Sequence, residues 1–144
     1  MALVLPDVGA DQILKAFFNN SWPASKNLKL RLYATNVTPL QTSVLGSFTE
    51  AAGGGYAAIT LTNGSWTVNV GNDPSDAVYA EQTFTFTGAL TTNPTVYGYY
   101  LEDNDGSAGV LVYAELFGTP FTPANNGDNI KVTPKFQLSS GTPA

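Results

Sequence analysis

The sequence predicts an all-β protein, an antiparallel β-sandwich of jelly-roll type with about eight strands and one N-terminal helix. Three observations predict this class. Most segments alternate apolar and polar residues with a period of two, as a strand with one buried face does. Turn residues interrupt them about every 8–12 residues, which is typical of sandwiches and barrels. Only one segment has helical spacing, so parallel βαβ units are not expected.

Residues 1–26 are expected to form an N-terminal arm and helix in front of a β-sandwich domain at residues 27–144. The arm begins with an apolar run that includes Leu3 and Leu5. Helical spacing then predicts a helix over residues 8–19, and the asparagines and serine that follow it end the helix.

One apolar stripe runs along this expected helix. Its members recur at helical spacing and are Ala10, Ile13, Leu14, Phe17 and Phe18. A helix of about 12 residues is marginal alone in water, so the stripe must dock on another surface. That surface is either the chain's own β-domain or a neighbouring subunit, and both alternatives remain open.

A period of two begins at Asn27 and recurs in separate segments as far as residue 138. Strands are expected at residues 27–33, 56–62, 65–70, 77–87, 95–102, 109–117 and 130–138. The dipeptide Asn63-Gly64 predicts a hairpin turn between the second and third of these. Pro134 falls inside the last one, which indicates an edge strand or a proline whose missing donor faces outward.

Three consecutive glycines, Gly53, Gly54 and Gly55, predict a sharp bend, because glycine reaches backbone angles closed to other residues. They are no phosphate-binding loop, since the lysine and the following helix of that motif are missing. Glu50 stands beside them in a chain with few charges. It is expected to pair with Arg31 or to accept hydrogen bonds from the glycine amides, in either case with a structural role.

The charge pattern excludes several classes of protein. Charged residues make up 12% of the 144 residues, and the net charge is −5. Phosphate contacts need a basic surface, so no nucleic-acid partner is expected. No segment approaches the roughly 20 apolar residues of a membrane span, and the N-terminus lacks the basic region of a signal peptide. We therefore expect no membrane partner and assembly in a cytoplasm.

No catalytic apparatus is visible in the sequence. Histidine and cysteine are absent, which excludes disulfides, Ser-His-Asp and Cys-His sites and the usual zinc sites. The remaining carboxylates, Glu102, Asp103 and Asp105, are interpreted as a solvated hairpin tip, where an adventitious calcium ion is the alternative. An EF-hand is excluded because Leu101 and Val112 occupy ligand positions. We expect neither enzymatic activity nor a cofactor.

Four tyrosines lie on the hairpin expected over residues 95–117. They are Tyr97, Tyr99, Tyr100 and Tyr113. Tyrosine offers a large apolar area with a polar end, which serves core packing, subunit contacts and sugar stacking alike. The pattern alone leaves these three roles open.

Several segments together resemble the small virion proteins of tailed bacteriophages. They are residues 19–23 (NNSWP) after the helix, 28–33 (LKLRLY), 48–57 (FTEAAGGGYA), 64–66 (GSW), 82–88 (QTFTFTG), 96–100 (VYGYY) and 120–127 (PFTPANNG). The likeness covers most of the chain and is strongest to capsid cement, or decoration, proteins. It implies a structural protein of the virion, bound to the outer capsid surface, that clamps neighbouring major capsid subunits and assembles as a homotrimer.

On this resemblance the N-terminal arm and helix, or loops at one end of the sandwich, are expected to contact the shell. The candidate contact residues are Leu3, Leu5, Ile13, Phe17, Phe18, Tyr97 and Tyr99. The main alternative is a tail, baseplate or fibre component that binds a host receptor or a glycan. A free carbohydrate-binding module is a third, weaker interpretation.

Overall fold

The computed structural model describes residues 3–18, 27–69, 75–91, 93–103 and 109–138, without the side chains of residues 15–17 and 138. The helical elements are α1 (Asp7–Phe18) and the short 3-10 turn η1 (Leu45–Ser47). The strands are β1 (Leu3–Val4), β2 (Leu28–Tyr33), β3 (Ile59–Leu61), β4 (Thr67–Asn69), β5 (Ser75–Val78), β6 (Gln82–Thr85), β7 (Val96–Asp103), β8 (Val110–Phe121), β9 (Asn129–Val132) and β10 (Lys135–Leu138). The described chain is therefore mostly β, and its strand pairs are antiparallel, as the sequence predicts.

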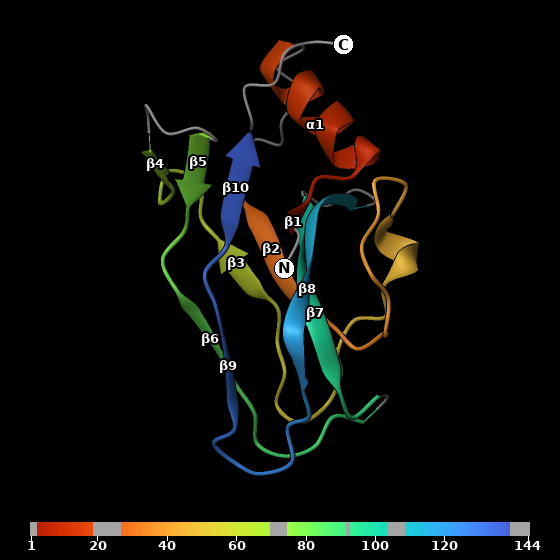
Figure 1. Ribbon diagram of the computed structural model, residues 1–144. Helices are drawn as coiled ribbons and strands as arrows, with labels where there is room; N and C mark the ends of the chain where they lie inside the picture. The colour runs from red at the N-terminus through yellow and green to blue at the C-terminus, as the bar shows by residue number, and fades with distance from the viewer. Residues whose placement is uncertain (1–2, 19–26, 70–74, 92, 104–108, 139–144) are drawn as a thin grey trace.

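A five-stranded sheet with the order β1-β8-β7-β2-β3 forms one side of the molecule (Figure 1). Its outer strand β1 pairs Leu3 with Glu115 of β8. Helix α1 also packs on β8, and Gln12 Nε2 donates a hydrogen bond to Asp103 Oδ2 at 2.9 Å. Of the two alternatives for the helix, the structure therefore shows docking on the chain's own domain. The sheet joins elements on both sides of the boundary expected at residue 26.

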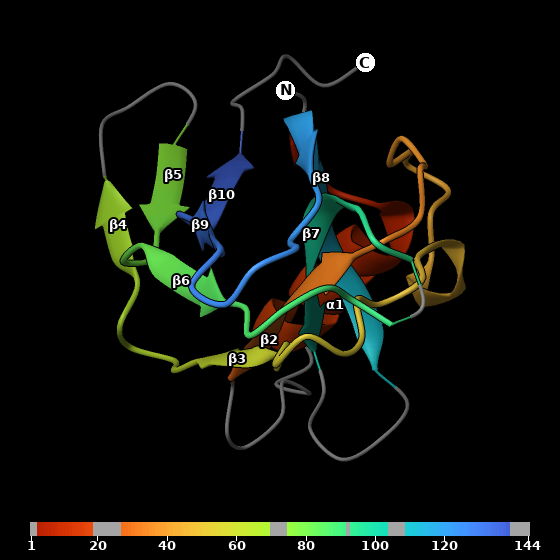
Figure 2. The same ribbon diagram turned by 90° about the horizontal axis from the view of Figure 1, so that it is seen from below.

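A long bent ribbon forms the other side of the molecule (Figure 2). β5 pairs with β10, β6 pairs with β9, and β4 adds to the outer edge of β5. The register slips by one residue where the ribbon bends: Val78 pairs with Lys135, whereas Gln82 pairs with Val132. Each of the strands expected at 77–87 and 130–138 is thus divided in two, because Pro134 has no amide hydrogen to continue the ladder.

The main core lies between the five-stranded sheet and the ribbon. Its fully buried members include Leu30, Leu32 and Leu101 from the sheet and Phe86 from the chain beside the ribbon. Each such side chain stabilises the fold by roughly 1.5–3 kcal/mol. This core depends on the alternation in β2, which turns every second residue toward the ribbon.

The opposite face of the five-stranded sheet carries a second, smaller core. Tyr33, Phe48 and Tyr100 pack there, with ring centroids 4.8 Å apart for Tyr33 and Phe48 and 5.7 Å apart for Phe48 and Tyr100. Val8 of α1 and Leu45 of η1 cover this cluster. Both faces of the sheet are therefore buried, which accounts for the mixed apolar pattern of β7.

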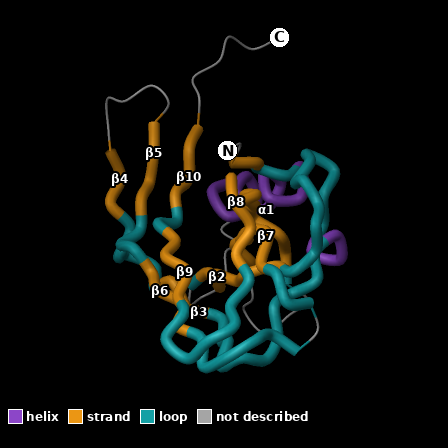
Figure 3. Tube along the Cα trace, turned by 60° about the horizontal axis from the view of Figure 1, so that its bottom comes forward, coloured by secondary structure: helices purple, strands orange, loops and turns teal. Residues whose placement is uncertain are grey.

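The hairpin expected at Asn63-Gly64 is wrong, although the turn itself is present. Gly64 has a φ of +86°, and Ser65 N donates to Thr62 O at 3.3 Å. The strands on either side join different sheets, because β3 pairs with β2 and β4 pairs with β5. The turn therefore carries the chain from one sheet to the other. The loop after β6 and the loop between β8 and β9 lie at the end of the molecule away from α1 (Figure 3).

Candidate functional site

An ionic cluster around Arg31 is the most elaborate polar arrangement in the described structure. Arg31 Nη1 donates to both carboxylate oxygens of Glu50, at 2.7 and 2.8 Å, and Arg31 Nε donates to Glu102 Oε2 at 2.5 Å. Burial lowers the pKa of the guanidinium, but the two carboxylates outweigh burial and raise the pKa above its ordinary value. The pairing of Arg31 with Glu50 that the sequence predicts is thus present, with Glu102 as a second partner.

Tyr56 connects this cluster to the chain that follows the glycines. Its hydroxyl donates to Glu50 Oε1 at 2.9 Å and accepts a hydrogen bond from Leu32 N at 3.1 Å. Burial raises the pKa of Tyr56 most, and the negative charge of Glu50 raises it further. The Glu50 carboxylate therefore accepts hydrogen bonds from both the Arg31 guanidinium and the Tyr56 hydroxyl. These bonds hold the loop before the glycine bend against β2.

The three glycines form the predicted bend. Gly53, Gly54 and Gly55 have φ angles of +82°, +54° and +75°, in the left-handed region that side chains disfavour. A Cβ atom on Gly54 would lie 2.5 Å from Gly88 O, and Thr87 N donates to Gly54 O at 2.8 Å. The bend thus requires glycine for two reasons, its backbone angles and its close approach to residues 87–89.

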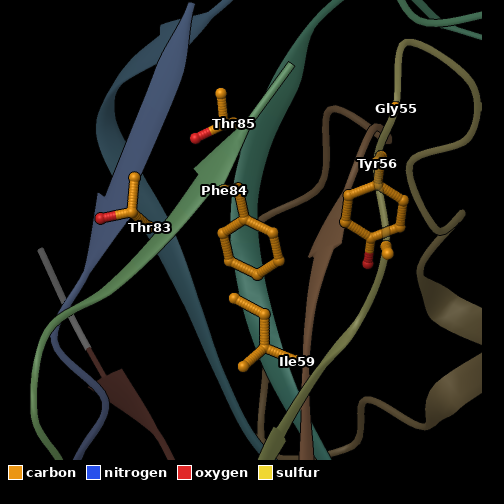
Figure 4. A pocket seen from close by; sticks show the side chains of 7 residues that line it. Gly55, Tyr56, Ile59, Thr83, Phe84 and Thr85 are labelled. Carbon is orange, nitrogen blue, oxygen red and sulfur yellow. The ribbon is translucent and has the colours of Figure 1, made fainter. Parts of the chain in front are cut away.

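A pocket of about 190 Å³ opens just beyond this bend, between the edges of β3 and β6 (Figure 4). The rings of Tyr56 and Phe84 stack in it with centroids 5.8 Å apart, and Ile59 lies below them. Thr83 and Thr85 point to the other side of β6 (Figure 4). The pocket is small and lined by these stacked rings, and it lies where the two sheets separate.

The prediction that the carboxylates lie on a solvated hairpin tip is wrong for Glu102 and Asp103. Glu102 and Asp103 are buried at the end of β7, which continues one residue further than expected. Antiparallel pairing with β2 brings Glu102 opposite Lys29 and diagonally beside Arg31. Asp105 lies outside the described residues. No group of three or more residues able to hold a metal ion occurs within the described part of the chain.

The candidate contact residues fall in different environments. Leu3, Leu5 and Ile13 are half-buried, and Leu3 and Leu5 pack against the main core of their own chain. The Phe17 side chain lies outside the described residues. Phe18 is 75% exposed on α1, where Leu14 is also 55% exposed. The N-terminal stripe is therefore partly docked and partly open to solvent.

The tyrosines of the β7–β8 hairpin are core residues with one exception. Tyr99, Tyr100 and Tyr113 are buried, and the Tyr99 hydroxyl donates to Glu115 Oε2 at 2.6 Å. A surface contact through Tyr99 is therefore wrong, because its ring faces the main core. Tyr97 is half-buried and lines a separate cleft of about 310 Å³ with Asn36 and Asn93.

Sequence reasoning missed Glu102, Tyr56 and Gln12 as members of the polar network. β2 places a cation at every second position, Lys29 and Arg31, but β7 carries charges only at its end, so the contact of Glu102 with Arg31 follows from the register between the two strands. The contacts of Tyr56 and Gln12 depend on the bend and on helix docking, which no local pattern specifies. Within the described residues, no helix has the length and apolar character needed to cross a membrane.

Comparison of this chain with protein-family models, curated proteins and solved structures finds no match.

Proposed function

We propose that this chain is a capsid cement, or decoration, protein of a tailed bacteriophage. It binds the outer capsid surface, clamps neighbouring major capsid subunits and assembles as a homotrimer, with the jelly-roll sandwich as its expected topology. The proposal begins from the resemblance of its sequence segments to such proteins.

One structural observation supports a protein partner in particular. Leu14 and Phe18 are exposed on α1, while most aromatic side chains of the described chain are at least half-buried. Neighbouring exposed apolar side chains are typical of a protein interface, whose centre is rich in aromatic and depleted in charged residues. The C-terminal turn of α1 is therefore the contact that we assign to the shell or to a neighbouring copy.

The polar network fits a passive structural role. Arg31, Glu50, Glu102 and Tyr56 are hydrogen-bonded to one another and join four segments of the chain. Such a network resists distortion when the protein is under load from its neighbours. A clamp needs this rigidity more than it needs a reactive group.

Sedimentation and shell binding test this proposal. The purified protein is expected to sediment as a trimer and to raise the melting temperature of undecorated, expanded shells. The double variant Leu14→Ser/Phe18→Ser is expected to lose trimerisation or shell binding while its circular dichroism spectrum is unchanged. Val68→Ser is the matched control, since Val68 is 64% exposed on β4, in the other sheet.

Two outcomes would count against the proposal. A monomeric protein that ignores shells but is retained on host polysaccharide would favour a tail, baseplate or fibre component instead. A double variant that trimerises and binds shells like the parent protein would remove the C-terminal turn of α1 from the interface.

A further inference from the structure

Two Asn-Gly pairs occupy exposed turns of the described chain. Asn63-Gly64 lies between β3 and β4, and Asn126-Gly127 lies between β8 and β9. Glycine has no side chain to shield its backbone nitrogen, so this nitrogen can attack the side-chain amide carbon of the preceding asparagine. The two pairs share one chemistry, and their surroundings in the fold decide whether each reacts.

The reaction is deamidation through a cyclic imide. A bond forms between the glycine nitrogen and the asparagine Cγ, the bond from Cγ to the side-chain nitrogen breaks, and ammonia leaves with the proton from the glycine amide. Water then opens the ring at either carbonyl, which yields aspartate or isoaspartate. Water is the only other reactant, and the net change is one amide exchanged for one carboxylate.

The Asn126-Gly127 turn holds its nucleophile in a hydrogen bond. The Gly127 N–H donates to Phe86 O at 2.9 Å. The turn is further closed by Asp128, whose Oδ2 accepts hydrogen bonds from Ala124 N at 2.8 Å and Asn125 N at 2.9 Å. Attack on Asn126 would therefore first have to break the Gly127 hydrogen bond, which slows ring closure.

The Asn63-Gly64 turn leaves both reacting groups accessible. No described residue accepts a hydrogen bond from the Gly64 N–H, and none bonds to the Asn63 side-chain amide. The space beside the Cα of Gly64 is open, as it is beside Gly127, so the two turns differ in the hydrogen bonding of the glycine nitrogen rather than in crowding. The hydrogen bonds that anchor this turn use other atoms, since Asn63 N donates to Asn27 Oδ1 at 2.8 Å and Ser65 N donates to Thr62 O.

We propose that Asn63 is a site of spontaneous deamidation in the folded protein and that Asn126 is protected from it. The product adds one negative charge to the turn between the two sheets. Where isoaspartate forms, the backbone also gains one carbon at the point where the chain crosses from β3 toward β4. The protein therefore becomes chemically heterogeneous with age at one defined position.

Peptide mapping by mass spectrometry tests this inference on the unmodified chain. The folded protein is incubated at mildly alkaline pH, digested and compared at intervals, with isoaspartate detected independently by enzymatic carboxyl methylation. The peptide containing Asn63 is expected to convert at least about fivefold faster than the peptide containing Asn126, the factor that about 1 kcal/mol supplies. The same incubation in urea is expected to bring the two rates together, because unfolding removes the Gly127 hydrogen bond.

Equal rates in the folded protein, or faster conversion of Asn126, would overturn the proposal. Asn63→Gln is the matched variant, because its longer side chain disfavours ring closure and leaves a neutral amide. It is expected to remove the acidic species that accumulates on ion exchange. A parent-like rate of acidic drift in Asn63→Gln would equally refute the assignment.

Discussion

Arg31 and Glu50 are joined by two hydrogen bonds from one guanidinium nitrogen, and this contact ties strand β2 to the loop before the glycine bend. The other side of the guanidinium holds Glu102 of β7. One cation thus lies between two carboxylates and offsets their mutual repulsion in a partly buried site. Removal of the Arg31 guanidinium should therefore lower the free energy of unfolding more than removal of an exposed ion pair does.

The variant Arg31→Met is expected to lower the free energy of unfolding by about 2–4 kcal/mol, because it leaves the buried Glu102 without its cation and leaves Glu50 with the Tyr56 hydroxyl alone. Urea denaturation monitored by fluorescence measures this change. Lys131→Met is the matched control, since Lys131 pairs with Glu81 at 3.1 Å on the surface, and its expected effect is within about 0.5 kcal/mol. Similar losses in both variants would show that the Arg31 cluster adds little to stability.

Gly54→Ala is expected to destabilise the protein more than Gly64→Ala. Both glycines have positive φ angles, so each variant should lose roughly 1–2 kcal/mol from backbone strain. Gly54→Ala also brings Cβ within 2.5 Å of Gly88 O and 2.9 Å of Ala89 O, whereas the space beside Gly64 is open. This clash should add about 1–3 kcal/mol, which thermal or urea unfolding can resolve. Equal losses of stability in the two variants would mean that the segment at Gly88 and Ala89 moves away from the new Cβ at little cost.

Stability is expected to fall at alkaline pH. Burial raises the pKa of Tyr33, Tyr56, Tyr99 and Tyr100 above the ordinary value of 10.0. A group whose pKa is raised by folding contributes stability below its unfolded pKa, and that contribution is lost as the pH rises through the folded value. The free energy of unfolding should therefore decrease steadily above about pH 10.

Phenolate absorbance provides the direct check of this alkaline behaviour. Most tyrosines in urea should ionise near their ordinary pKa, while the native protein should show delayed ionisation that coincides with unfolding. Complete ionisation of all seven tyrosines in a protein that is still folded would contradict the burial of these hydroxyls.

The acid limb of the stability profile should depend on Asp128. Hydrogen bonds from Ala124 N and Asn125 N hold the pKa of Asp128 below its ordinary value of 3.8. A carboxyl group whose pKa is lowered by folding stabilises the protein at pH values above its unfolded-state pKa. This stabilisation is lost as the pH falls through its folded-state pKa. Asp128→Asn should therefore unfold with a weaker dependence on pH below about 4. An unchanged acid slope in this variant would assign the dependence to other carboxylates.

Local patterns in the sequence were sufficient for the class of fold and for several elements. Period two located β2 and the β7–β8 hairpin, and helical spacing placed α1 within one residue of its observed ends. The glycine triplet predicted a bend because its cause is local, namely backbone angles that only glycine tolerates readily. The scarcity of charges made Arg31 one of two expected partners of Glu50, the glycine amides being the other, and the structure shows the pairing with Arg31.

The remainder of the fold depends on contacts between distant segments. Asn63-Gly64 looks like a hairpin turn, but β3 finds a better partner in β2, and no short-range signal reveals that competition. Tyr99 looks like an interface residue because its local sequence does not show that both faces of β7 are covered. The position of Glu102 required the register between β2 and β7, which is fixed by packing of both sheet faces.

The pairing of Leu3 with Glu115 has a consequence for how the protein folds. The outer strand of the five-stranded sheet cannot form until residue 115 has been synthesised and has left the ribosome, so the N-terminal segment must wait for most of the chain. Loop-closure entropy opposes such distant pairings until many contacts form together, and folding over milliseconds to seconds is typical of this topology. During that interval Leu3 and Leu5 lack the core contacts that cover them in the folded chain.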